Sequence, residues 1–142
     1  EEISTPYISE IELERFTMNI HGLNASFGII LRNPSNNWIE LKDVGCKITV
    51  EGVTLFSGRV KPAIIIPPQE NEKILLNLSI SDPEKMNILV SQISKQSSLN
   101  VSVTLLGKYS TKYTFSPHSG TFSANASARF KIYTCPICVF KG

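Results

Sequence analysis

Apolar and polar residues alternate along most of this chain, which is the pattern of strands with one buried and one exposed face. The alternation starts at Ile11 and Leu13 and resumes one residue out of step at Phe16 and Met18. A slip of one residue within a regular strand predicts a β-bulge, because the extra residue keeps the apolar side chains on one face.

Six further apolar runs extend this pattern. They lie at 25–32, 38–50, 53–60, 74–80, 99–105 and 122–132. The run at 38–50 loses its period between Leu41 and Val44, and the Glu51-Gly52 pair after it indicates a tight hairpin turn. Short strands separated by turns at this spacing predict a mainly all-β fold, a sandwich or barrel of about seven strands.

One segment has the period of a helix instead. Its apolar residues recur at i, i+3, i+4 and i+7, at Met86, Leu89, Val90 and Ile93. The preceding Ser81-Asp82-Pro83-Glu84 predicts a capping box, in which the Ser81 hydroxyl and the Glu84 carboxylate satisfy each other's backbone amides. We expect the apolar stripe to cover one open end or edge of the sandwich. The alternative is an exposed stripe that docks on a partner or a membrane surface.

The last strand is the most regular in the chain. One face of it carries Phe122, Ala124, Ala126, Ala128, Phe130 and Ile132. The small alanines imply that something bulky packs over them, either the helix or aromatic side chains of the facing sheet. The alternative is that they leave a cavity between the sheets for an apolar ligand.

Length and composition predict one globular domain over residues 1–142, with a core at about 11–133 and a short tail at 134–142. Apolar residues make up 42% of the chain and charged residues 18%, a balance that excludes a disordered chain. The net charge of +2 is too small to indicate a nucleic-acid surface, so we expect no nucleic-acid partner.

Localisation is left open by the start of the chain. No apolar run reaches the ~18 residues that a membrane helix needs. The chain begins with Glu1-Glu2 rather than Met, so we expect that a tag, a signal or a membrane anchor has been removed upstream. A membrane tether through that segment is one of the expected outcomes.

The sequence Cys135-Pro136-Ile137-Cys138 has the spacing of a zinc knuckle. A structural zinc needs four ligands, and the others would have to come from Cys46, His21 or His118 in distant segments. We therefore predict no metal and interpret the pair as an apolar tail with two thiols or a short-range disulfide. The sequence contains no catalytic or phosphate-binding motif, so we expect no catalytic residue, no cofactor and no enzymatic activity.

The second and third apolar runs follow a specific order. A strand that includes Phe27–Leu31 runs into Asn33-Pro34, and the next strand ends in a hairpin at Gly52, followed by an apolar residue and Gly58. In this order the chain resembles the group-2 late-embryogenesis-abundant family, also called the WHy domain. Ser35 stands where the family pattern has a second Asn.

The resemblance implies a fibronectin-like antiparallel β-sandwich with one inserted helix at one end, a role in desiccation or other stress, and no known active site. Many members of the family are tethered to a membrane by an N-terminal helix. In this chain Pro34 pushes Asn33 into an extended conformation, so that its side chain can bond the backbone of the turn. We expect Asn33, Pro34, Gly52 and Gly58 to be structural rather than ligand-binding.

Two hypotheses for the function follow. The first is a non-enzymatic stress-protection or interaction domain that acts through its surface on proteins or membranes, as a monomer or weak oligomer. The second is an apolar-ligand or lipid-binding module with a cavity between its sheets. They differ in whether a dry core or a pocket lies between the sheets.

Overall fold

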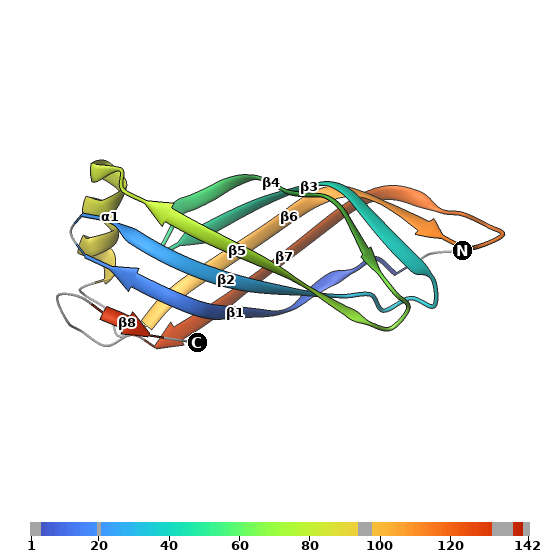
Figure 1. Ribbon diagram of the computed structural model, residues 1–142, viewed down its shortest axis with the longest axis horizontal. Helices are drawn as coiled ribbons and strands as arrows, with labels where there is room; N and C mark the ends of the chain where they lie inside the picture. Colours follow the sequence, from blue (N-terminus) through green and yellow to red (C-terminus); the bar gives the residue numbers. More distant parts are fainter. Residues whose placement is uncertain (1–3, 20, 94–97, 132–137, 141–142) are drawn as a thin grey trace.

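The computed structural model (Figure 1) describes residues 4–19, 21–93, 98–131 and 138–140. It is a sandwich of two four-stranded antiparallel sheets with one helix at one end. The first sheet has the order β5-β2-β1-β8, formed by β1 (Tyr7–Met18), β2 (Leu23–Arg32), β5 (Asn71–Ile80) and β8 (Cys138–Phe140). The second has the order β4-β3-β6-β7, formed by β3 (Trp38–Val50), β4 (Val53–Ile66), β6 (Ser98–Lys112) and β7 (Ser119–Lys131). The helix α1 (Pro83–Ile93) connects β5 to β6.

The expected fold is confirmed as a mainly β, fibronectin-like sandwich with one inserted helix. Strands β1, β2 and β5 face β3, β4, β6 and β7, which is the distribution of strands in a fibronectin type III domain. About seven strands were expected, and the described residues form eight. The additional strand is β8, whose backbone pairs with β1 at Phe16–Met18, although it lies in the segment expected to be a tail.

The two sheets bury the apolar faces of their strands against each other. Leu13 on β1, Phe27 on β2, Ile48 on β3 and Leu105 on β6 have no exposed surface. Burying one apolar side chain of this size stabilises the fold by roughly 1.5–3 kcal/mol. Every buried side-chain nitrogen or oxygen among the described residues has a hydrogen-bond partner. The period-2 pattern of the sequence therefore corresponds directly to the core.

Both predicted breaks in the strand period are irregularities of strand pairing. The pairing of β1 with β2 shifts by one residue at Glu14, which confirms the predicted bulge. The pairing of β3 with β6 shifts around Asp43, whose φ is 53°. The predicted hairpin is also confirmed, since Glu51 and Gly52 have φ values of 49° and 82°, the left-handed conformation that a two-residue hairpin needs.

The helix covers the end of the sandwich where the chain passes from the first sheet to the second (Figure 1). Leu89 has no exposed surface, Met86 and Ile93 are buried, and Val90 is partly buried. The stripe is thus part of the core, as expected, and not an exposed docking site. A helix of this length is marginal alone, so its stability depends on this packing.

The start of the helix corrects the predicted capping box. The backbone N–H of Met86 donates to the carbonyl oxygen of Asp82 at 2.9 Å, and that of Glu84 donates to Asp82 Oδ1 at 3.3 Å. Asp82 rather than Ser81 is therefore the N-cap, with Pro83 at the first helical position. The prediction was off by one residue because Ser and Asp are about equally favourable at an N-cap.

Of the two expected neighbours of the alanine face of β7, the facing sheet rather than the helix lies against it. Phe122 and Ala124 are buried, whereas Ala126, Ala128 and Phe130 are partly buried. The main neighbour of β7 across the sandwich is β1 rather than the helix. Small side chains suit this position because they let β7 and β1 approach each other closely.

Candidate functional site

Asn33, in the connection from β2 to β3, is fully buried and all its side-chain contacts are internal. Its Nδ2 donates to the carbonyl oxygens of Asn37 at 2.8 Å, Ile66 at 3.0 Å and Pro67 at 3.1 Å. Its Oδ1 accepts hydrogen bonds from the backbone N–H of Ser35 at 3.0 Å and from its hydroxyl at 2.8 Å. The amide is therefore fully used in joining the β2–β3 connection to the β4–β5 connection.

Backbone and side-chain contacts around Asn33 complete this junction. The Asn33 N–H donates to the carbonyl oxygen of Glu70 at 3.0 Å, and Gln69 Nε2 donates to that of Pro34 at 2.8 Å. The buried Ser35 hydroxyl donates to the Asn37 carbonyl at 3.0 Å. Ser35 thus acts inside the junction although it departs from the family pattern. The structural role of Asn33 and Pro34 stays a prediction, and a stability measurement on an Asn33 variant tests it.

Of the two glycines in the motif, the structure requires glycine at Gly52 but not at Gly58. Gly52 needs its positive φ for the hairpin between β3 and β4. Gly58 lies on β4 opposite Cys46 and has no such φ. An added Cβ at Gly58 would meet only the ring of Phe56, at 3.4 Å, so nothing around it requires glycine.

Trp38 at the start of β3, and Tyr113 and Phe115 in the connection from β6 to β7, are exposed aromatic residues. These parts of the chain lie at the end of the sandwich opposite the helix (Figure 1). We call Trp38, Tyr113 and Phe115 the aromatic end. The rings of Trp38 and Tyr113 are edge-to-face, with centroids 5.6 Å apart and planes at 87°. Tyr113 is 79% exposed and Phe115 is fully exposed. Grouped aromatic exposure of this kind marks interaction sites more often than isolated apolar residues do.

The aromatic end stands on a well-supported hairpin. The backbone N–H of Thr111 donates to the carbonyl oxygen of His118 at 2.9 Å, and that of His118 donates to Thr111 Oγ1 at 2.8 Å. Nearby, Glu40 accepts ion pairs from Lys112 at 3.3 Å and Lys42 at 3.7 Å. Two lysines thus share one carboxylate, so this group of three side chains carries a net positive charge.

Sequence reasoning did not identify the aromatic end. A signal was present, because Trp38 is the only tryptophan and follows a turn at once. Tyr113 and Phe115 alternate with Lys112 and Thr114, a spacing that predicts part of a strand. The period of apolar residues predicts which side chains are buried. Trp38, Tyr113 and Phe115 are of interest because they are large apolar side chains that are exposed.

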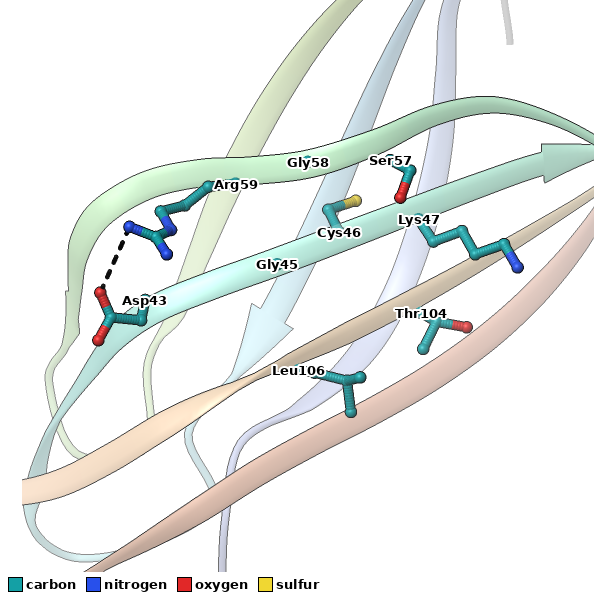
Figure 2. A pocket seen from close by; sticks show the side chains of 9 residues that line it. All are labelled: Asp43, Gly45, Cys46, Lys47, Ser57, Gly58, Arg59, Thr104 and Leu106. Atoms are coloured by element: carbon teal, nitrogen blue, oxygen red, sulfur yellow. Dashed lines mark ion pairs between the residues drawn. The ribbon is translucent and has the colours of Figure 1, made fainter.

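A groove lies on the outer face of the second sheet, over β3, β4 and β6, as Figure 2 shows. Its volume is about 750 Å³, and it is lined by Asp43, Gly45, Cys46, Lys47, Ser57, Gly58, Arg59, Thr104 and Leu106. Arg59 Nη1 and Asp43 Oδ1 are 3.8 Å apart across it, and both side chains are largely exposed. Burial raises the pKa of the Cys46 thiol to about 11, so the thiol stays protonated and unreactive at neutral pH. The groove therefore brings together no nucleophile with a base.

An ion-pair cluster lies on the outer face of the first sheet. Lys73 on β5 contacts Glu12 at 2.8 Å and also Glu14, both on β1. The hydrogen bond from Lys73 lowers the pKa of Glu12, and the two carboxylates raise the pKa of Lys73 above its ordinary value. All three side chains are at least one third exposed, so this is a surface network and not a buried acid–base pair.

The cysteine prediction stays untested. Cys135 lies outside the described residues, as does the start of the chain at Glu1-Glu2, and Cys138 is described only by its backbone in β8. Among the residues that the structure describes, no three His, Cys, Asp or Glu side chains are placed to share a metal ion. No helix within those same ranges is long and apolar enough to cross a membrane.

Comparisons with known proteins identify no family for this chain. No family model matches the chain, and no curated protein matches it. Among solved structures, a protein from Archaeoglobus fulgidus is similar, with a TM-score of 0.45 and 11% sequence identity, over 89% of this chain and 99% of that chain. The resemblance to the late-embryogenesis-abundant family stays a prediction from the sequence.

Proposed function

We propose that this protein is a non-enzymatic interaction domain that binds membrane surfaces through its aromatic end. The observation that carries the proposal is the exposure of Trp38 at the start of β3 and of Tyr113 and Phe115 on the hydrogen-bonded hairpin between β6 and β7. Rings held in water without a partner have an unfavourable free energy that contact with an apolar phase would remove.

The chemistry of the three side chains favours the boundary between lipid and water. Trp and Tyr combine an apolar ring with a polar N–H or O–H, and both are enriched at the level of the lipid headgroups. Phe115 is fully exposed at the hairpin and has no polar atom, so it would enter the acyl region. Lys112 and Lys42, which outnumber Glu40 beside them, would meet anionic headgroups.

Stress protection is the setting in which we place this activity. Support comes from the resemblance around Asn33-Pro34, whose family is associated with desiccation and cold. A compact domain that binds membrane surfaces could protect them under stress without catalysing a reaction. The alternative of an apolar ligand between the sheets gains no specific observation, because the described groove lies on the outer face of one sheet (Figure 2).

Sedimentation with phosphatidylcholine vesicles, with and without phosphatidylglycerol, tests the proposal. The Phe115→Ser variant should lose most of the bound fraction at an unchanged melting temperature (Tm), since Phe115 makes no core contact. Leu75→Ser is the matched control, because Leu75 is 53% exposed on the outer face of the first sheet. Equal binding by Phe115→Ser and wild type, or loss of binding in Leu75→Ser alone, would overturn the proposal.

A further inference from the structure

Within the residues that the structure describes, no strand pairs with the outer edge of β7. Among the described residues, β6 is the only strand that pairs with β7, and it does so over the whole length of β7 without a shift of register. From Ser119 to Ala128 the strand contains no charged residue and no proline. Natural edge strands are normally blocked by charges, prolines or bulges, because a free edge is a template for another strand.

The other long edge of the same sheet does carry such protection. Strand β4 contains Arg59 and Pro62, and its pairing with β3 is irregular at two places. On the first sheet, the edge strand β5 has the charged residues Glu72 and Lys73 near its start, and the Lys73 side chain reaches inward to β1. The stretch of β7 from Ser119 to Ala128 differs from β4 and β5 in having neither charges nor irregular pairing, so it is the edge best suited to add another strand.

The sequence of β7 is symmetric about its centre. Ser123-Ala124-Asn125-Ala126-Ser127 reads the same in both directions. An antiparallel copy centred on Asn125 therefore places Ser opposite Ser on the outer face and Ala opposite Ala on the inner face. On the inner face the next pair would be Phe122 with Ala128, a large side chain against a small one.

The charges of β7 fit the same arrangement. The basic residues Arg129 and Lys131 are confined to one end of the strand. In the antiparallel pairing they would lie opposite Thr121 and Ser119, so that no like charges face each other. The exposed surface that remains on Ala128 would be covered by the partner's strand.

We propose that two copies of this chain pair antiparallel through β7, with the two-fold axis at Asn125, and form one continuous eight-stranded sheet. Strand addition at a sheet edge is an established mode of recognition, and here each copy supplies the same edge. The strands of the two copies run in opposite directions, so the two aromatic ends point away from each other and stay free. The proposal is therefore independent of membrane binding.

Analytical ultracentrifugation of matched double variants tests this register. Ser123→Lys with Ser127→Lys puts lysine opposite lysine at two places and should weaken the dimer by at least about tenfold. Ser123→Lys with Ser127→Glu puts lysine opposite glutamate and should keep it. Both pairs of substitutions remove the same 3.1 Å contact between Ser127 and Ser102, so monomer stability is matched. Ser79→Lys with Gln92→Lys, on exposed sites away from β7, controls for added charge.

A mixing experiment makes the test specific for this pairing. The Lys/Lys variant and a Ser123→Glu, Ser127→Glu variant should each be monomeric alone and should form a dimer when combined. A wild-type chain that stays monomeric at hundreds of micromolar would overturn the proposal. So would a dimer that the Lys/Lys and Lys/Glu variants retain or lose equally, because its interface would lie elsewhere.

Discussion

The side chain of Lys73 crosses strand β2 directly above Gly28. A Cβ at Gly28 would lie 2.6 Å from Lys73 Cε, so any larger residue would make the lysine side chain shift from its path over the strand. Beyond it, Lys73 Nζ lies 2.8 Å from Glu12 Oε1 on β1 and also contacts Glu14. One cation on an edge strand is thereby tied to two carboxylates two strands away.

Replacing Lys73 with Met should lower the Tm in a pH-dependent manner. The pKa of Glu12 is lowered in the folded chain, so its stabilisation is present above the ordinary value of 4.5 and is lost as pH falls through the lowered value. The pKa of Lys73 is raised, so its contribution is present below the ordinary value of 10.5 and is lost only at higher pH. The Tm difference between variant and wild type should be largest between these two values.

Thermal melts across acidic and neutral pH measure that difference. Lys108→Met, which removes an exposed lysine from β6, controls for the change in net charge. A Tm difference for Lys73→Met that stays constant down to pH values at which carboxylates are protonated would show that the ion pairs are not its cause.

Asn33→Ala should destabilise the chain by about 2–4 kcal/mol, because it leaves buried carbonyl groups of two connections without donors. Chemical denaturation measures the free energy of unfolding. Asn36→Ala, in the same turn but exposed, should cost little. An Asn33→Ala variant that keeps wild-type stability would show that the junction does not support the fold.

Leu89→Ala should destabilise by about 2–5 kcal/mol, through lost burial and the cavity left at the end of the sandwich. The neighbouring Ile88→Ala is the control, since Ile88 is 50% exposed and its loss should stay within about 0.5 kcal/mol. Similar values for the two variants would mean that α1 does not pack on the core as described.

Asp82→Ala should cost about 0.5–2 kcal/mol, the usual value of an N-cap, whereas Ser81→Ala should be close to neutral. Both can be measured by chemical denaturation at neutral pH. The reverse order of the two costs would restore the capping box with Ser81 as the N-cap.

The sequence predicted best those features that depend on residues only a few positions apart. Strand period, the bulge at Glu14, the hairpin at Glu51-Gly52 and the stripe around Leu89 each follow from the spacing of side chains a few residues apart. The cap was misplaced by one residue, since Ser81 and Asp82 both suit that position and only the hydrogen bonds decide between them.

The candidate sites depended on contacts that sequence spacing does not contain. Asn33 bonds the carbonyl of Ile66, 33 positions away, and that partner is set by how two connections meet. Likewise, the aromatic end combines the start of β3 with the hairpin after β6. The spacing of apolar residues cannot predict this grouping, because only buried faces impose a period on the sequence and these residues are exposed.

The fluorescence of Trp38 tests the account's central claim most directly. It is the only tryptophan and it lies in the aromatic end, so its emission reports that end alone. Titration with anionic phosphatidylcholine–phosphatidylglycerol vesicles should shift the emission to shorter wavelength. Phe115→Ala should require roughly tenfold more lipid for the same shift, the equivalent of about 1.4 kcal/mol of lost apolar transfer. Emission that stays unchanged at saturating lipid, or an equal shift in wild type and Phe115→Ala, would contradict the proposal that the aromatic end binds membranes.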